Sequence, residues 1–153
     1  MFTRKLQITI ILILITSVCL SQPTKNNFEK MIDQKCKFIK TELQLTEDQD
    51  KAFMPIFREF ELKRKELHDK KRDLLNNYDK NSLNMSADEL TKLSDEFVEV
   101  DSKMAQLGNE YHQKFKKVLP PVKLILLYKA DHDFKKQLLK KMKDSKDDKC
   151  IGE

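Results

Sequence analysis

Few side chains in this sequence are of the types that do chemistry, and they are widely spaced. The three histidines are His68, His112 and His132, and no two have the four-residue spacing that puts two metal ligands on one helical face. Residues 131–133, around His132, are the best local metal candidate, but consecutive helical residues point in different directions. No nucleophile stands beside a base, and the 2 glycines form no phosphate-binding loop. We therefore expect no enzyme, no metal site and no cofactor.

The cysteines leave two alternatives open. Cys36 shares a helical face with Ile32 and Ile39, where it would behave as a small buried hydrophobe. In an exported protein it could instead form a disulfide with Cys150, within one chain or between two. Sequence alone does not decide between a buried thiol and a bridge.

Residues 1–21 have the pattern of an export signal. Arg4 and Lys5 form a basic start, Ile8 to Leu20 is apolar, and a cleavage site follows at Ser21. The apolar run is short of the roughly 20 residues that a membrane-spanning helix needs. We expect cleavage after Ser21, with a lipidated Cys19 and an uncleaved anchor as alternatives.

The rest of the chain has the composition of long, solvated helices. Charged residues make up 36% of the sequence, and tryptophan is absent. We expect one all-α domain over residues 22–143. The net charge of +5 is mild and both signs are interspersed, which argues against a nucleic-acid partner. We expect the lysine-rich stretch 135–149 to be a solvated helix end rather than a membrane-surface patch, because Asp144, Asp147 and Asp148 dilute its charge.

Two helices are expected to meet at a tight corner near residue 45. Apolar residues recur at steps of three and four over residues 25–43, the pattern of an amphipathic helix. Thr46 and Gln49 then form a capping box, so a second helix begins at once and runs to about Tyr78. Pro55 lies inside that helix and should bend it.

Two more helices follow an asparagine-rich loop over residues 76–84. Ser86 and Glu89 form a second capping box, which begins a long third helix that we expect to be the longest element. Close packing of another helix would explain Gly108 within it. The pair Pro120–Pro121 ends that helix and begins a fourth, which runs to about Lys143. We expect a disordered tail over residues 144–153. The apolar positions expected in the fourth helix are Val122, Ile125, Leu126, Ala130, Phe134 and Leu138.

The corner carries a motif that resembles a known family. Leu45, Thr46 and Gln49 match the LTxxQ motif of the Spy/CpxP-like periplasmic proteins, in which it tends to occur twice. A degenerate second copy spans residues 119–123: it keeps Leu119 but has Pro120 in place of Thr and a lysine in place of Gln. The copies share a register, because Phe53 and Phe60 follow Leu45 by the same offsets at which Leu127 and Phe134 follow Leu119. Residues 117–139 are also similar to exported proteins identified as sensors of extracytoplasmic-function sigma factors.

The resemblance implies four helices forming an elongated, curved helical hairpin assembly, often a homodimer, that acts in the periplasm during envelope stress. Spy-like members bind unfolded polypeptides without ATP, whereas CpxP-like members inhibit a sensor kinase. More distant metal-sensing relatives control the release of a sigma factor. The leading hypothesis is therefore an ATP-independent chaperone for unfolded envelope proteins. The alternative is a regulatory sensor, with or without a response to metal, whose partner is a membrane-bound sigma-factor or kinase system.

The hypothesis of a chaperone directs attention to the aromatic residues near the corner. Phe53, Phe57, Arg58 and Phe60 mix apolar and ionic character and are the candidate polypeptide-binding residues. Aromatic residues at this spacing also fit a helical core. Likewise, Leu45, Thr46 and Gln49 could bind a ligand or only begin a helix.

Overall fold

The computed structural model describes residues 27–150, with side chains as far as Asp144. This part of the chain is all-α, as predicted. Its elements are α2 (Asn27–Glu42), α3 (Glu47–Asn81), a 3-10 turn (Ser82–Asn84), α4 (Ala87–Lys116) and α5 (Pro121–Cys150). The predicted export signal and the side chain of Cys150, with the disulfide considered for it, lie outside the described residues.

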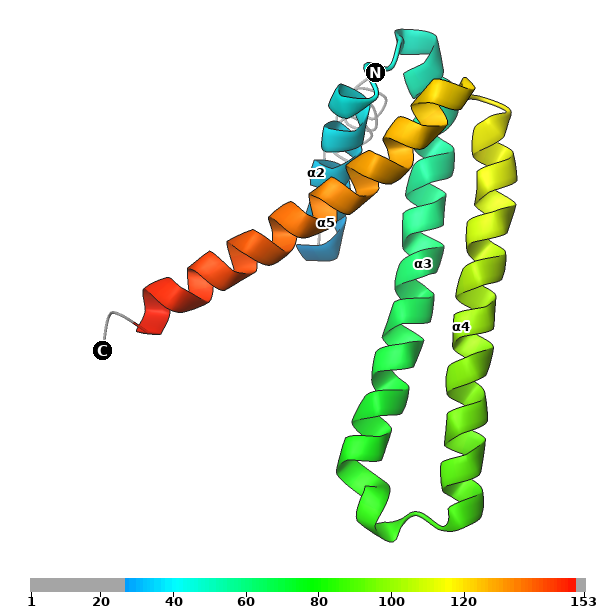
Figure 1. Cartoon of the computed structure of the whole chain (residues 1–153), viewed down its shortest axis with the longest axis vertical. Helices are drawn as coiled ribbons and strands as arrows, with labels where there is room; N and C mark the ends of the chain where they lie inside the picture. The colour runs from blue at the N-terminus through cyan, green and yellow to red at the C-terminus, as the bar shows by residue number, and fades with distance from the viewer. Residues whose placement is uncertain (1–26, 151–153) are drawn as a thin grey trace, which may run out of the picture.

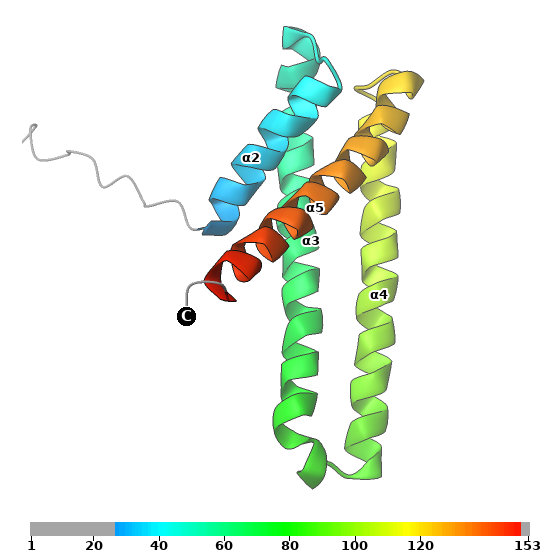
Figure 2. The ribbon, with the colours of Figure 1, turned by 60° about the vertical axis from the view of Figure 1, so that its left-hand side comes forward.

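Helices α3 and α4 form a long antiparallel hairpin, and α2 and α5 pack against one end of it (Figure 1). The turned view in Figure 2 shows α2 and α5 side by side near the end where α4 leads into α5, while the other end of the hairpin extends well beyond them. We call the part of the hairpin that α2 and α5 cover the four-helix end, and the remainder the two-helix end.

The helix starts follow the local signals in the sequence. At Ser86 the hydroxyl accepts from the backbone N–H of Glu89 at 3.3 Å, and the Glu89 carboxylate accepts from the N–H of Ser86 at 2.8 Å. The equivalent reciprocal pair begins α3 at Thr46. Pro121 is the first residue of α5, a position where the missing N–H costs nothing. All three predicted starts are confirmed.

The helix ends differ more from expectation. Helix α3 continues past Tyr78 to Asn81, so it is the longest element at 35 residues, and α4 has 30. The expectation of a longest third helix was wrong, since the asparagines at 76 and 77 continue the helix rather than breaking it. Helix α5 extends beyond Lys143 to Cys150, into the predicted tail. The span of α3 includes Pro55, and a bend there stays a prediction.

The core is divided between the two ends of the hairpin. At the four-helix end the buried residues are Ile39, Leu43, Phe53, Phe57, Leu107, Tyr111, Phe115, Leu119, Leu124, Leu127 and Ala130. At the two-helix end they are Leu74, Leu93 and Val100. The four-helix end therefore buries many more side chains than the two-helix end, although Val100 at the two-helix end is also 0% exposed.

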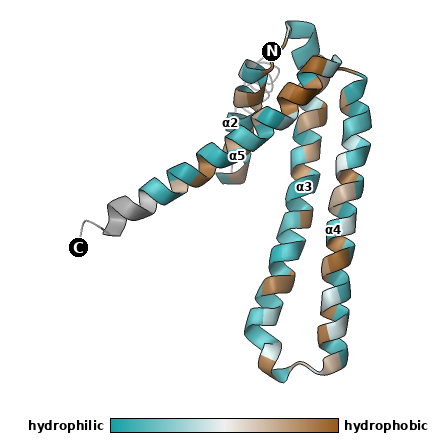
Figure 3. Ribbon diagram, viewed as in Figure 1, coloured by the Kyte–Doolittle hydropathy of each residue, from teal (hydrophilic) through white to brown (hydrophobic). Residues whose placement is uncertain are grey.

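The predicted buried face of α5 is partly wrong. Val122 and Ile125 are both 71% exposed, while Leu124 and Leu127 are 8% and 2% exposed. The early part of α5 is apolar around most of its circumference, as its brown colour in Figure 3 shows, so periodicity alone did not identify the packed side. Leu127 was identified only by its register with Phe53, which is 0% exposed.

Gly108 was expected to make room for another helix, and this interpretation is also wrong. A Cβ atom built on Gly108 would have no heavy atom within 4 Å in the described part of the chain. The space beside Gly108 is open, so close packing does not account for this glycine.

Candidate functional site

The two copies of the motif meet at the four-helix end. Gln49 donates its backbone N–H to the Thr46 hydroxyl at 3.3 Å, and its side-chain oxygen accepts from the N–H of Thr46 at 3.3 Å. That same oxygen accepts a hydrogen bond of 2.6 Å from the ammonium of Lys123. Lys123 occupies in the second copy the position that Gln49 has in the first. The motifs therefore bind one another and join the starts of α3 and α5.

Lys123 also holds the end of α2. Its ammonium donates to the backbone oxygen of Gln44 at 2.8 Å. Gln44 adopts the left-handed conformation with φ of 46°, and the N–H of Leu45 reaches back to the oxygen of Lys40 at 3.3 Å. This is the Schellman arrangement that ends many helices. A positive charge beside these carbonyl groups complements the negative end of the α2 dipole.

The remaining motif residues serve packing and backbone geometry. Leu119 is 4% exposed in the core, and Leu45 packs against the same core while half-buried. Pro120 is exposed, and its carbonyl oxygen accepts from the N–H of Leu124 at 3.2 Å in the first turn of α5. The contacts of these residues are those of a helix junction, which supports the structural interpretation of the motif.

The aromatic residues predicted to bind polypeptides lie largely inside the molecule. Phe53 and Phe57 are 0% and 1% exposed, and their rings lie 5.2 and 6.3 Å from that of Phe115 on α4. Phe60 is half-buried, with its ring 5.2 Å from Tyr111. The expectation that Phe53 and Phe57 form a binding surface is wrong for this conformation, because α4 covers them.

Arg58 lies at the edge of the same region. It forms an ion pair with Asp33 of α2, and 43% of its side chain remains exposed. This pairing fastens α2 to α3. Arg58 is thus accessible to a ligand, but the aromatic partners expected around it are not.

A cluster of charged side chains lies under α5, and sequence patterns did not reveal it. Lys35 is 2% exposed and pairs with Asp131 and, at 3.0 Å, with Glu61, which is 3% exposed. Arg64 binds Glu61 at 2.7 Å, and Lys135 binds Asp131 at 2.6 Å. The cluster joins α2, α3 and α5.

The electrostatics of this cluster favour its charged state. Burial alone would raise the pKa of Asp131, but Lys35, Arg64 and Lys135 outweigh that effect and hold the pKa well below its ordinary value of 3.8. Lys35 also lies 5.7 Å from the centre of the Phe57 ring, a favourable cation–π distance. Since its carboxylates are neutralised by cations of the chain, the cluster does not offer them to an external metal.

The three histidines do not come together with other side chains as a set of metal ligands in the described part of the chain. His132 is exposed, whereas its neighbour Asp131 is turned toward Lys35. His112 Nδ1 lies 2.6 Å from the hydroxyl of Tyr128, and His68, whose pKa is lowered by burial and then by Arg64, stands among cations. Over residues 27–144 there is no group of 3 or more His, Cys, Asp or Glu side chains that could hold a metal ion.

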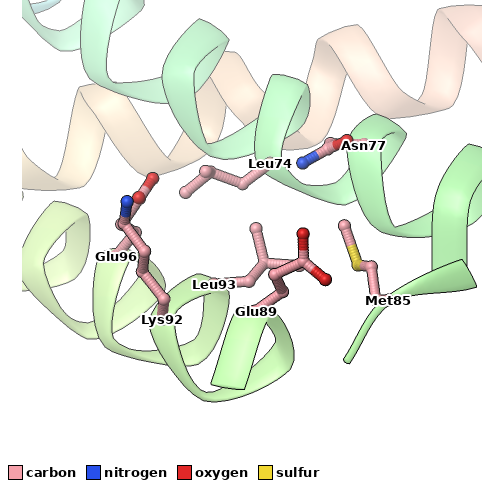
Figure 4. Close-up of a pocket in the computed structure, with 7 residues that line it drawn as sticks. All are labelled: Leu74, Asn77, Met85, Glu89, Lys92, Leu93 and Glu96. Carbon is pink, nitrogen blue, oxygen red and sulfur yellow. The ribbon is translucent and has the colours of Figure 1, made fainter. Parts of the chain in front are cut away.

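An open surface with both apolar and charged character lies along one side of the hairpin. A hollow of about 210 Å³ at the two-helix end is drawn in Figure 4. Its lining side chains are Leu74, Asn77, Met85, Glu89, Lys92, Leu93 and Glu96. The leucines and the methionine form its floor, while Glu89, Lys92 and Glu96 stand at its edge (Figure 4).

A second hollow, of about 310 Å³, continues the same side of the hairpin toward the four-helix end. Its lining side chains are Lys63, Glu66, Leu67, Lys103, Gln106, Leu107 and Glu110. Residues 67 and 74 are seven apart, as are 96 and 103, and seven residues are close to two helical turns. The two hollows therefore share one side of each helix. We call the residues that line them the hairpin face.

Comparison with known proteins does not assign this chain to a family or a function. The chain matches no family model, no curated protein and no solved structure. Among the described residues, no helix has the length and apolar character needed to cross a membrane.

Proposed function

We propose that this protein is a non-enzymatic, ATP-independent chaperone that binds unfolded polypeptides on the hairpin face. The supporting observation is the pair of hollows with leucine floors and charged edges along α3 and α4. Taken with the resemblance to Spy/CpxP-like proteins, the proposal includes export to the periplasm, clients among unfolded envelope proteins, and a homodimer.

The chemistry of the hairpin face suits a variable ligand. Leu74 and Leu93 can accept apolar side chains, and they share their hollow with Lys92 and Glu96, which have opposite charges. In the second hollow Leu67 lies with Lys103 and Glu110, again one of each sign. An unfolded chain presents apolar and charged groups in no fixed order. A shallow surface with both kinds of contact binds many such segments weakly, whereas a deep pocket selects one shape.

The direct test measures aggregation of a denatured client with an equimolar amount of the chain from Gln22 to Glu153, without nucleotide. We expect aggregation to be suppressed. Unchanged aggregation would contradict the proposal and would favour the alternative of a regulatory sensor with one specific membrane-bound partner.

A cross-linking experiment tests the location. Gln106 lines the second hollow, whereas Ala105 is exposed but does not line it. In a background with Cys36 and Cys150 replaced by alanine, Gln106→Cys and Ala105→Cys each receive a benzophenone label. We expect the label at position 106 to capture the denatured client far more often than the label at 105. Equal capture at both positions would place the client elsewhere.

A further inference from the structure

Helix α5 has a second apolar side that the fold does not use. Its packed side contributes Leu124, Leu127 and Ala130 to the core. On the outward side Ile125 is 71% and Leu139 is 67% exposed. Other large apolar side chains of α5 that remain exposed are Val122, Tyr128 and Met142. These side chains are exposed in the monomer and are not part of its buried core, so the fold alone does not explain why they are apolar.

Lysines form a row beside these apolar residues. Lys129, Lys136 and Lys143 are spaced by seven residues, which places them along one side of the helix. Ile125 and Leu139 belong to a neighbouring row, in which His132 is the middle member. All six side chains are exposed. The outward side of α5 thus consists of an apolar row and a parallel basic row, which we call the α5 face.

Among the α5 side chains that the structure describes, which end at Asp144, the acidic residues do not interrupt this pattern. At about 100° per residue, Asp133 and Asp144 fall beyond the lysine row, on the side away from Ile125 and Leu139. Asp131 points into the buried charge cluster, where it pairs with Lys35. The sequence-based expectation of a solvated helix end depended on Asp144, Asp147 and Asp148; the side chains of Asp147 and Asp148 lie outside the described residues, and Asp144 lies off the lysine row.

We propose that the α5 face docks on an anionic lipid surface. A helix that lies in the plane of a membrane interface places apolar side chains among the acyl chains and lysines among the headgroups, as these two rows would do. Helix α5 crosses in front of α2 and α3 in Figure 1, so its outward side can approach a flat surface. Docking would use a different surface from the hairpin face and goes beyond the proposed chaperone activity.

The absence of tryptophan from the sequence permits a direct test. Ile125→Trp places the sole tryptophan of the chain on the α5 face, and Val98→Trp is a matched control on α4, because these residues are 71% and 70% exposed. Each variant, spanning residues 22–153, is mixed with vesicles of phosphatidylglycerol or of phosphatidylcholine. We expect the emission of the Ile125→Trp variant alone to shift to the blue, and only with phosphatidylglycerol.

Several results would overturn the proposal. These are no shift with phosphatidylglycerol, equal shifts at both positions, or an equal shift with phosphatidylcholine. A blue shift that grows with protein concentration in the absence of vesicles would show that a second copy of the chain covers the α5 face instead. Because client aggregation is measured without lipid, failure of the lipid proposal is distinguishable from failure of the chaperone proposal.

A charge variant tests the lysine row separately. Each lysine near an anionic surface contributes about a fivefold increase in partitioning. Replacing Lys129, Lys136 and Lys143 by glutamine should therefore lower binding to phosphatidylglycerol vesicles by at least tenfold. The control replaces three exposed lysines of α3 that do not line the hairpin face and should bind nearly as well as the unchanged chain; its substitutions are Lys51→Gln, Lys70→Gln and Lys80→Gln. Equal losses in both variants would indicate only general attraction and would contradict docking through α5.

Discussion

The four-helix end and the two-helix end of the hairpin are made from the same two helices, yet they bury very different side chains. At the four-helix end, Tyr111 and Phe53 are 0% exposed, and even Lys35 is 2% exposed. In the described part of the chain, the four-helix end has 11 buried core residues, whereas the two-helix end has 3: Val100 is 0% exposed there, and Leu74 and Leu93 are each 9% exposed. The difference shows that the contribution of α2 and α5, rather than the composition of α3 and α4 alone, determines where the molecule has a closed core.

This difference has consequences for dynamics and function. Local opening is easiest where few apolar contacts are buried and backbone hydrogen bonds lie near solvent, and binding surfaces are often drawn from such regions. The first hollow of the proposed client surface, around Leu74 and Leu93, therefore lies in the less enclosed part of the hairpin, whereas the second hollow reaches Leu107 in the core of the four-helix end.

The largest expected effect comes from breaking the buried charge cluster. Lys35→Ala would remove the most deeply buried cation of the cluster, which pairs with both Asp131 and the 3% exposed Glu61. Removing one partner of a buried pair typically costs about 3–5 kcal/mol. We expect a loss of that size in the free energy of unfolding, measured by urea denaturation followed by circular dichroism.

The matched control for Lys35 lies on the exposed part of the hairpin. Lys71 pairs with Asp101 between α3 and α4, and these side chains are 35% and 56% exposed. Lys71→Ala should cost less than about 1 kcal/mol, because exposed pairs contribute little. Equal losses at positions 35 and 71 would contradict the contrast between the two regions.

The same cluster predicts an acid dependence of stability. The pKa of Asp131 in the folded protein lies below its ordinary value of 3.8. Its stabilising contribution is therefore complete above that ordinary value and is lost as the pH falls through the folded-state pKa. Asp131→Asn should lower stability near neutral pH and make the decline below about pH 4 less steep. Unfolding curves at a series of pH values measure both the stability near neutral pH and its decline in acid. If the decline in acid is as steep in the variant as in the unchanged chain, Asp131 is not its source.

A smaller effect is expected at the two-helix end. Leu74→Ala should cost about 2 kcal/mol, the lower end of the range for buried leucines, because its site is already partly open. Amide hydrogen exchange should show the loss mainly in residues 70–100, with the residues around Phe57 nearly as protected as before. Uniform loss of protection along α3 would show that the hairpin opens as one unit.

The sequence predicted best what depends on neighbours in the chain. Thr46 with Gln49 and Ser86 with Glu89 form their capping boxes within four consecutive residues, so both helix starts were predictable. The end of α2 was expected at residue 43 and lies at Glu42, although Gln44 adopts a left-handed conformation more typical of glycine. Local rules also favoured a helix end at residues 76 and 77, but the helix continued to Asn81.

What sequence reasoning missed depends on contacts between distant segments. Lys35 and Glu61 are 26 residues apart, and Lys123 reaches Gln49 across 74 residues. No periodicity within one helix encodes such pairs. The same limit applies to α5, where Ile125 and Leu127 are both apolar and only packing on the other helices determines that Leu127 is buried.

The two capping boxes allow a comparison of similar chemistry at opposite ends. Replacing Thr46 or Ser86 by alanine should cost about 1 kcal/mol of helix stabilisation in each case. Thr46 belongs to the junction with Lys123, so its loss should lower global stability. The loss at Ser86 should mainly increase local exchange near the start of α4. Denaturant unfolding measures the global loss of stability, and amide hydrogen exchange measures the local one. An equal loss of global stability in the Thr46→Ala and Ser86→Ala variants would show that the tip of the hairpin is coupled to the whole fold.

The smallest expected effect has the opposite sign. Gly108 lies within α4 with open space around it, so Gly108→Ala gains helix propensity without a clash. We expect an increase of up to about 1 kcal/mol in the free energy of unfolding, measured by urea denaturation at low protein concentration. A decrease would mean that some other chain approaches this position in solution, because nothing in the described part of the monomer does. Repeating the measurement at high concentration would sharpen the result, since a gain that becomes a loss as the protein associates would place Gly108 at the interface of the proposed homodimer.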